Sequence, residues 1–292
     1  MPTGLGRQKE PKIIHLTENL VIYYPDRAGS PCFDHFNQGP SMKEIEREIK
    51  ANLSEMGMPL SGIAAVRELE RVPRDFSPGK TLAGAQSGIS FGLPVPKGVI
   101  YSGSNALDSY WRYCNMSYRL LDTAAMRLCV MIEERGFLAC PAYGCFPWKI
   151  SGKEYWGVLP LVYWAKEAGL GGLTRAGLLA EPIHGTRVLL GGVITDAELA
   201  PSARVPQDPC PQGCRACIDA CPVKAIAESG KVDHGRCMRR SGANPLLWQL
   251  LQDRAVKEKF SLETLFNTVG VDDHGAYTCF RCVEVCPLNT NT

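Results

Sequence analysis

The C-terminal part of the chain concentrates eight of its thirteen cysteines. They form two runs that each end in a Cys-Pro pair, with one cysteine between the runs: Cys210, Cys214, Cys217, Cys221, Cys237, Cys279, Cys282 and Cys286. Three thiolates close together in a loop can hold three corners of a cubane iron–sulfur cluster, and the fourth, just before a proline, ligates the other cluster of a pair. The spacing therefore predicts two [4Fe–4S] clusters with no ligand missing and none spare.

Because the cysteine before each proline ligates the other cluster, each cysteine can be assigned to one of the two clusters. The first cluster is expected to take Cys210, Cys214, Cys217 and Cys286. The second is expected to take Cys237, Cys279, Cys282 and Cys221. The pattern resembles that of a two-cluster bacterial ferredoxin, with one residue more between the first two cysteines and with Cys237 displaced far upstream of its run. Both departures are compatible with cluster binding, because a cluster needs four thiolates in space and not a fixed loop length.

Zinc ribbons or disulfide bonds are the alternative uses for so many cysteines. Zinc needs no proline after the last cysteine of each run and is usually bound by two separate Cys-x-x-Cys pairs. Residues 1–10 are polar and contain no apolar core, so neither a secretory nor a twin-arginine signal is predicted there. Many cysteines without an export signal indicate a reducing compartment, and we expect a cytoplasmic protein whose thiols serve as ligands.

Composition and net charge narrow the possible partners. The 292 residues are enough for two domains, and 45% hydrophobic and 21% charged residues are ordinary for a globular protein. A net charge of +2 gives no reason to expect a nucleic-acid or anionic-membrane partner. The longest apolar run, residues 156–165, is half as long as a membrane span, so no membrane partner is expected either.

Strands alternating with helices precede the cysteines and must position whatever the clusters serve. Ser41 and Glu44 form a capping box before a helix that Gly57 can end, and a long apolar stripe predicts a second helix over about 105–135, ended by Gly136. A helical segment is also expected at 160–168, and strands at 20–24, 61–66, 88–96, 137–141 and 188–194. The pattern predicts an α+β fold.

Three domains follow from this reading. Residues 1–40 form an N-terminal extension, residues 41–205 the first folded domain, and residues 206–292 the cluster domain. The boundary near 205 falls in a proline-rich stretch that is typical of a linker.

A glycine-rich stretch between 169 and 192 lies at the end of the first domain. Glycines allow the backbone to approach a large flat ligand closely. The element Gly169-Leu170-Gly171-Gly172 superficially resembles a dinucleotide-binding fingerprint. It lacks a preceding strand and the full spacing of that motif, so a dinucleotide site is not predicted.

The same stretch resembles the matching segment of the epoxyqueuosine reductase and reductive dehalogenase superfamily. The elements that carry the resemblance are Ala168–Gly171, Arg175, Gly177–Leu179, Gly185–Val188 and Thr195-Asp196. They stand in the family's order: a strand ending in Leu-Pro, a long helix, this segment and then two clusters. The resemblance is specific over 168–290 and looser before that.

The resemblance implies a nitroreductase-like domain that binds base-off cobalamin without flavin, followed by a ferredoxin-like domain whose clusters feed electrons to cobalt. It implies an external low-potential donor, a ferredoxin or flavodoxin. The corrin is expected in a cavity walled by the long helix and the glycine-rich segment. The residues expected to hold it are Gly169, Gly171, Gly172, Arg175, Gly177, Leu178 and Arg187.

The catalytic residues of the family are matched less well by this sequence than its other elements. The epoxyqueuosine enzymes carry Arg-Asp-Tyr-His in the long helix, with an aspartate as proton donor, and the counterpart here, residues 116–119, has no acid. Tyr118, or else Tyr113, is the candidate donor, with Arg112 or Arg119 able to lower the pKa of a phenol. Both tyrosines could equally be half-buried helix residues. The C-terminal helical repeats of many epoxyqueuosine reductases, an obvious docking surface for tRNA, are absent from this sequence.

Three functions are compatible with these observations. The first is a cobalamin-dependent reductase that removes a halide or hydroxyl group from a small molecule. The second is an electron-transfer protein that reduces or reactivates the corrinoid of a partner protein, which the missing acid favours. The third is a cluster protein whose first domain has lost its cofactor.

Overall fold

The computed structural model describes residues 13–17, 20–23, 41–69, 76–144, 147–152, 154–205, 208–243, 250, 252–262, 264–265, 276–277 and 279–289. The chain divides into two compact units, residues 1–39 and 40–292. In the first unit, β1 (Ile13–Thr17) and β2 (Leu20–Tyr23) pair antiparallel, so the strand predicted at 20–24 is present.

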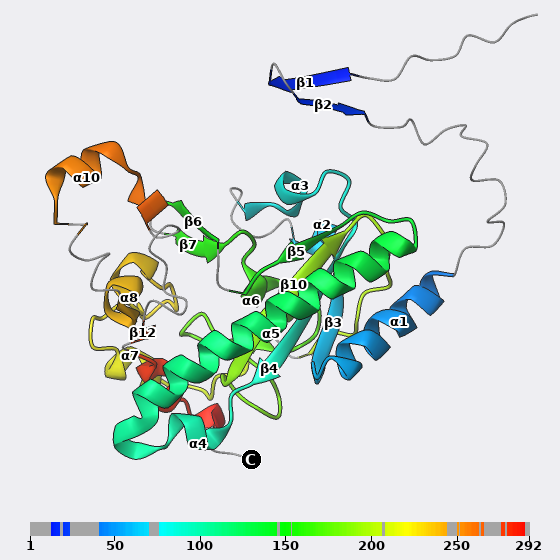
Figure 1. Cartoon of the computed structure of the whole chain (residues 1–292). Helices are drawn as coiled ribbons and strands as arrows, with labels where there is room; N and C mark the ends of the chain where they lie inside the picture. Colours follow the sequence, from blue (N-terminus) through cyan, green and yellow to red (C-terminus); the bar gives the residue numbers. More distant parts are fainter. Residues whose placement is uncertain are drawn as a thin grey trace, which may run out of the picture. The chain divides into compact units, whose positions relative to one another are not determined.

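A four-stranded antiparallel sheet is the centre of the second unit (Figure 1). Its order is β3 (Leu60–Ala65), β4 (Ser87–Pro94), β10 (Val188–Thr195) and β5 (Ala139–Ala142). The two central strands pair over their whole length, from Val188 opposite Pro94 to Thr195 opposite Ser87. All four strands fall where the sequence predicts strands, and their pairing brings the glycine-rich β10 to the middle of the sheet.

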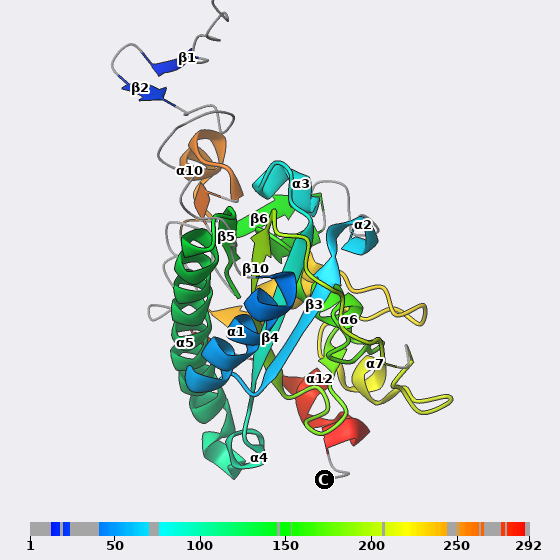
Figure 2. The ribbon, with the colours of Figure 1, turned by 90° about the vertical axis from the view of Figure 1, so that its right-hand side faces the viewer.

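Helices cover both faces of this sheet (Figure 2). On one face lie α1 (Met42–Glu55) and the long α5 (Ala106–Glu134), and on the other lies α6 (Leu161–Glu167). Successive side chains of β10 point to opposite faces of the sheet and so contribute to both cores. Leu189 and Val193 belong to the core beneath α5, whereas Leu190 and Ile194 belong to the core beneath α6. The α+β sandwich expected from the sequence is confirmed.

Local signals explain where the two main helices begin and end. Ser41 and Glu44 form both hydrogen bonds of the capping box, and the Ser41 amide donates to Glu44 Oε2 at 2.7 Å. Gly57 follows α1 with φ of 75°, and Gly136 follows α5 with φ of 87°. Glycine adopts this left-handed conformation without steric cost, which is why both helices end at these residues.

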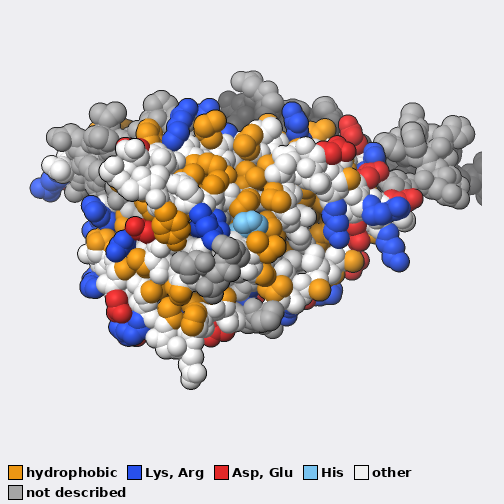
Figure 3. Space-filling view, turned by 90° about the horizontal axis from the view of Figure 1, so that it is seen from below, with side chains coloured by type: hydrophobic (Ala, Val, Ile, Leu, Met, Phe, Trp, Pro, Cys, Tyr) orange, Lys and Arg blue, Asp and Glu red, His pale blue; other side chains and the backbone are white. Residues whose placement is uncertain are grey.

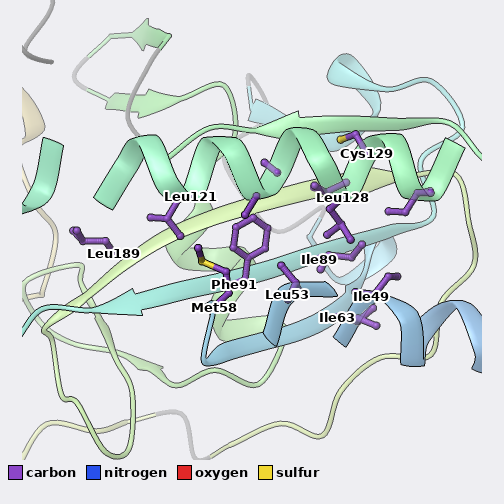
Figure 4. Close-up of a cluster of buried hydrophobic side chains, with 14 of the residues drawn as sticks. Ile49, Leu53, Met58, Ile63, Ile89, Phe91, Leu121, Leu128, Cys129 and Leu189 are labelled. Atoms are coloured by element: carbon purple, nitrogen blue, oxygen red, sulfur yellow. The ribbon is translucent and has the colours of Figure 1, made fainter. Parts of the chain in front are cut away.

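The main core fills the space between α5, α1 and the sheet (Figure 4). Phe91 of β4 and Leu121 of α5 are fully buried there, and Gly191 of β10 leaves room for both of them. A methyl group on Gly191 would lie 2.9 Å from the Phe91 ring and 3.2 Å from Leu121. Full burial of each such large side chain contributes about 1.5–3 kcal/mol, so this core holds α5 rigidly on the sheet.

Two small hairpins project from the sandwich. One consists of β6 (Trp148–Ser151) and β7 (Glu154–Gly157), and the other of β8 (Gly172–Leu173) and β9 (Leu179–Ala180). The first hairpin was not predicted from the sequence. Short helical turns lie along the chain between β3 and α5: α2 (Val66–Leu69), α3 (Pro78–Thr81), α4 (Lys97–Ile100) and η3 (Gly103–Asn105).

The cysteine-rich region consists of short elements. They are α7 (Ala216–Ala220), α8 (His234–Ser241), β11 (Gly242–Ala243), α10 (Arg254–Lys259), β12 (Ala276–Tyr277), α12 (Arg281–Glu284) and η4 (Pro287–Asn289). β11 pairs with β12. Since residues 40–292 form one compact unit, the domain boundary near residue 205 stays a prediction. No helix in the described part of the chain is long and apolar enough to cross a membrane.

Candidate functional site

The thiols of the predicted first cluster set lie near one another. Burial raises the pKa of Cys217, and the neighbouring thiols of Cys210, Cys214 and Cys286 raise it further. The pKa of Cys286 is raised in the same way, by burial and then by Cys210 and Cys214. The loop around α7 and the turn before η4 therefore bring together four cysteines that are up to 76 residues apart in the sequence.

The predicted second set is gathered in the same way from three segments. Burial raises the pKa of Cys237, with Cys279 and Cys221 as the neighbouring thiols. Burial also raises the pKa of Cys282 to about 12, with further contributions from Cys237, Cys279 and Cys217. Because Cys217 belongs to the first set, the two sets meet at Cys217 and Cys282.

The thiols of neither set are arranged like the ligands of a single ion. Across the residues that the structure describes, no three His, Cys, Asp or Glu side chains lie at the spacing of a mononuclear metal site. The irons of a cubane occupy separate corners, so its four thiolates stand farther apart than the ligands of one ion. Which thiol ligates which cluster stays a prediction.

The first set borders the sandwich. A small cavity of about 20 Å³ lies between its thiols and three residues near β8, β9 and β10, namely Thr174, Arg175 and Thr186. Figure 3 views the end of the molecule at which α4 and α12 lie, where a broad band of hydrophobic side chains is interrupted by a histidine and a few basic side chains. The glycine-rich segment is thus in contact with the cluster region.

A buried amide joins the end of the cysteine-rich region to β10. Asn289 is fully buried, and its Oδ1 accepts a hydrogen bond of 2.8 Å from the Thr186 amide. Its Nδ2 donates to Val283 O at 2.6 Å and to Thr186 Oγ1 at 3.0 Å. Gly185 makes this approach possible, because a Cβ there would lie 2.5 Å from Leu288 O. Sequence reasoning missed this junction.

An aromatic stack joins α5 to the second set. Tyr110 stacks on Phe280 with ring centroids 4.7 Å apart and an interplanar angle of 27°. Burial raises the pKa of Tyr110 well above its usual value, and Cys114, Tyr118 and Cys282 raise it further. Tyr110 was not predicted as a site residue, although its position two turns before Tyr118 places both on the inner side of α5.

The two predicted proton donors differ in their surroundings. The Tyr113 hydroxyl donates to Pro94 O at 2.8 Å, so its proton is held by the end of β4. The half-buried Tyr118 ring packs against Gly144, where a Cβ would lie 2.6 Å from the ring. One turn further along α5, Asp122 accepts a hydrogen bond of 3.2 Å from the Gly144 amide.

Three of the glycines predicted to wall a corrin lie close to other parts of the protein. A Cβ at Gly169 would collide with Ala203 O, one at Gly171 with Ala180 O, and one at Gly177 would lie 3.3 Å from Val232. A side chain at any of these three residues would push protein segments apart, and their role in holding a corrin stays a prediction.

The residues predicted to hold the corrin also do not line one cavity. Gly171 and Gly172 border a pocket of about 330 Å³ that Glu181 and Leu288 also line, whereas Arg175 lines the cavity of the first thiol set. Leu178 packs against the α5 core. Arg187 is 4% exposed and donates from Nη1 to Val95 O at 2.5 Å, while its buried Nε has no hydrogen-bond partner.

Known proteins share the cysteine-rich region and the fold. Residues 210–289 match the model of the 4Fe-4S double cluster binding domain. An epoxyqueuosine reductase of Synechococcus sp. (strain RCC307) is 34% identical over 127 residues, which is 43% of this chain and 33% of the relative. The matched segment thus spans only about a third of that curated protein.

Two solved structures show the same fold over most of the chain. One, described as a reductive dehalogenase structure that suggests a mechanism for B12-dependent dehalogenation, has a TM-score of 0.55 at 15% identity, covering 88% of this chain and 33% of that one. The other is an epoxyqueuosine reductase with an epoxyqueuosine-modified tRNA stem loop, with a TM-score of 0.56 at 18% identity, covering 86% and 67%.

The sandwich and the double-cluster domain together define an iron–sulfur protein with a preceding α+β domain. The likeness to the epoxyqueuosine reductase and reductive dehalogenase superfamily, predicted from the sequence, is confirmed. One expectation is corrected: a structural neighbour is solved with a tRNA stem loop, which conflicts with the expectation, drawn from net charge, of no nucleic-acid partner.

Proposed function

We propose that this chain is a cobalamin-dependent iron–sulfur reductase that removes a halide or hydroxyl group from a small molecule, with low-potential electrons from an external ferredoxin or flavodoxin. The observation that supports it most is the meeting of the two thiol sets at Cys217 and Cys282, with the sandwich in contact with both sets. Such an arrangement gives electrons a short route from one side of the cysteine-rich region to the first domain.

The donor set fits two [4Fe–4S] clusters. Eight thiols stand in two neighbouring groups of four, and Cys286 and Cys282 are largely withdrawn from water. Burial keeps these thiols protonated before iron arrives, so cluster binding must release protons. Clusters supply one-electron transfer at low potential, and a cobalamin supplies a strongly reducing cobalt centre. The chain's own part is to hold the thiolates and to exclude water from them.

The fit to cobalamin is weaker, because the residues predicted to hold it do not line one cavity. Support for the cofactor comes from the fold likeness to a structure whose description names B12-dependent dehalogenation. The pocket bordered by Gly171 and Gly172 is within the size range of ligand sites.

Cobalamin retention tests the proposal directly. Protein reconstituted anaerobically is expected to contain about eight irons per chain and to retain added cobalamin through gel filtration, with the absorption spectrum of the base-off form. Cys217→Ser protein, which still has one complete thiol set, is the control for binding that depends on intact clusters. Full iron content without cobalamin retention would contradict the cobalamin part of the proposal.

A second function is favoured by the surroundings of the tyrosines. The Tyr113 proton is held by Pro94 O, and no acid stands at positions 116–119. An electron-transfer protein that reactivates a partner's corrinoid needs no proton donor. The Tyr118→Phe variant separates the two functions: a reductase should lose about 10²–10⁴-fold in turnover while cluster reduction is unchanged. Unchanged turnover of both Tyr118→Phe and Tyr113→Phe would favour the electron-transfer function.

A further inference from the structure

The Thr186 side chain, just before β10, reaches the cavity of the first thiol set. Thr186 is 5% exposed and lines that cavity together with Cys286. Burial raises the pKa of Cys286, while hydrogen bonds from the Leu288 amide and the Thr186 side chain act in the opposite direction. Two donors therefore stand beside this sulfur, and one of them is a hydroxyl group that comes from the sandwich.

The amide group of Asn289 shows where the Thr186 hydroxyl proton can go. A backbone N–H can only donate and a carbonyl can only accept, so the Thr186 amide identifies Oδ1 of Asn289 and the Val283 carbonyl identifies Nδ2. Nδ2 donates its second proton to Thr186 Oγ1 at 3.0 Å. Because the Thr186 oxygen is an acceptor for Asn289, the hydroxyl proton needs an acceptor of its own.

Two acceptors are near that proton. Asn289 Oδ1 lies 3.3 Å from Thr186 Oγ1, which is longer than the roughly 2.5–3.0 Å usual for an O–H···O hydrogen bond, and it already accepts from the Thr186 amide. The sulfur of Cys286 is the other acceptor, and it becomes a thiolate when it binds iron. Hydrogen bonds to ionised acceptors are roughly twice as strong as neutral ones, so the hydroxyl of the loaded protein should point to the sulfur.

We propose that Thr186 donates a hydrogen bond to the sulfur of Cys286 and thereby raises the reduction potential of the first cluster, an inference that rests on the cluster part of the proposed function. Reduction adds one electron, supplied by the external ferredoxin or flavodoxin, and the sulfurs share the added negative charge. A donor stabilises the reduced form more than the oxidised form, which is why hydrogen bonds to the sulfurs help to set cluster potentials. Asn289 strengthens this hydrogen bond, because donors in series polarise one another.

The second thiol set has a weaker counterpart of this contact. The Ser241 hydroxyl is half-buried and lies 3.9 Å from Cys237 Sγ. A hydrogen bond is electrostatically stronger where water is excluded, as it is around Thr186. The first cluster should therefore gain more from its hydroxyl donor than the second, which favours electron transfer to the cluster that borders the glycine-rich segment.

Redox titration of the full-length, cluster-loaded protein without cobalamin tests the proposal. Thr186→Val removes the hydroxyl group and keeps the shape of the side chain, so one of the two midpoint potentials should become more negative. At a fixed ambient potential, the ratio of reduced to oxidised first cluster should fall by up to about tenfold. Thr186→Ser keeps a hydroxyl group and should restore the potential of the parent. Electron paramagnetic resonance follows the reduced clusters, and iron analysis shows that each variant is loaded.

Thr174→Val is the matched control. Thr174 lines the same cavity and is 8% exposed, but its hydroxyl donates to Leu178 O at 3.0 Å and has no second proton for a sulfur. Both midpoint potentials should therefore be unchanged in this variant. Equal shifts in the two valine variants would show that the polarity of the cavity alone is responsible, and would overturn the proposal.

Iron content separates a failure of this proposal from a failure of the proposed function. Iron far below about eight atoms per chain in the parent would contradict the clusters themselves. Thr186→Val also leaves an Asn289 N–H without its acceptor, so Thr186→Ala, whose smaller side chain leaves room for a water molecule there, is the second variant. Full iron content with unchanged potentials, or loss of iron from both the valine and the alanine variant, would show that Thr186 has a structural role only and would overturn the proposal.

Discussion

At the scale of single residues, Asn289 is a buried polar side chain that joins the cysteine-rich region to the sandwich. Its amide is fully buried and satisfies groups on two sides, the Thr186 amide of the sandwich and the Val283 carbonyl of α12. Removing such a partner leaves buried polar groups without hydrogen bonds, which costs more than the hydrogen bond itself contributes. We therefore expect this residue to fix the position of the Cys286 turn relative to β10.

Asn289→Ala should lower the free energy of unfolding by about 1–3 kcal/mol and speed the release of iron from the first set. The loss of iron can be followed by absorbance during anaerobic incubation with a chelator.

Gly185→Ala should have a similar effect, because a Cβ there meets Leu288 O. Gly57→Ala is its matched control: Gly57 also has a positive φ, but a Cβ at this position meets nothing within 4 Å and the residue lies outside the cysteine-rich region. Equal iron release from the two glycine variants would show that backbone strain alone is responsible.

The exchange of the fourth ligand can be tested with paired cysteine variants. If Cys221 serves the second set, the double variant Cys221→Ser, Cys237→Ser damages one cluster and retains about four irons per chain. The double variant Cys221→Ser, Cys217→Ser then damages both clusters. The reverse result, with four irons retained only in the second pair, would show that Cys221 ligates the cluster of its sequence neighbours. Iron analysis and electron paramagnetic resonance of the reduced proteins give the answer.

Residues that act through local spacing could be predicted, and residues that act through distant contacts could not. The cysteines are recognisable because short loops and a following proline fix their geometry. Asn289 and Thr186 are 103 residues apart, and neither has an unusual local sequence, so only the folded structure shows that they meet. Gly171 is a further case: its type predicts a ligand wall, which stays a prediction, and only the folded structure shows that a Cβ there would collide with Ala180 O.

At the scale of elements, periodicity predicted the sandwich well. The helix expected over about 105–135 is α5 (Ala106–Glu134), and the strand expected at 188–194 is β10. The β6–β7 hairpin was missed because its short strands are half-buried and show no clear alternation of apolar and polar residues. The order of the strands could not be predicted from the sequence either. The place of β10 between β4 and β5 depends on contacts between residues that are far apart along the chain.

The hairpin contacts α8 through a histidine that should respond to pH. His234 accepts a hydrogen bond of 3.3 Å from the Tyr155 amide, lies 3.2 Å from Glu154, and packs edge-on against Trp156 at 4.5 Å. Burial lowers the pKa of His234 below its usual 6.5, although Glu154 and Asp233 act in the opposite direction. The folded protein therefore favours neutral His234.

Lowering the pH below about 6.5 should weaken this contact, because the unfolded chain then binds a proton that folded His234 resists. Above that pH both states hold neutral histidine and no penalty exists; below it, stability falls by up to about 1.4 kcal/mol per pH unit. His234→Gln should abolish this part of the slope. Thermal unfolding of both proteins between pH 5.5 and 7.5 gives the difference, in which acid loss of clusters is common to both. Parallel slopes would contradict the assignment.

At the scale of the whole molecule, the cysteine-rich region and the sandwich interlock at three places. Asn289 binds Thr186, Phe280 stacks on Tyr110 of α5, and His234 contacts the β6–β7 hairpin. The predicted linker near residue 205 suggested two separate domains, because proline-rich stretches often separate them. Residues 40–292 form one compact unit, and the boundary near residue 205 stays a prediction.

This interlocking makes a prediction about iron removal. If the two parts were independent domains, stripping the clusters with a chelator would loosen only the region after residue 205. Because Tyr110 and Thr186 depend on partners in the cysteine-rich region, we expect loss of iron to increase amide hydrogen exchange at 106–118 of α5 and 184–187 before β10 as well. Helix α1 serves as internal control, since its buried residues belong to the core beneath α5 and it makes none of the three contacts named above. Hydrogen exchange measured by mass spectrometry on loaded and stripped protein decides the matter: an increase confined to residues after 205 would support two independent domains, and an increase that includes α1 would indicate global unfolding.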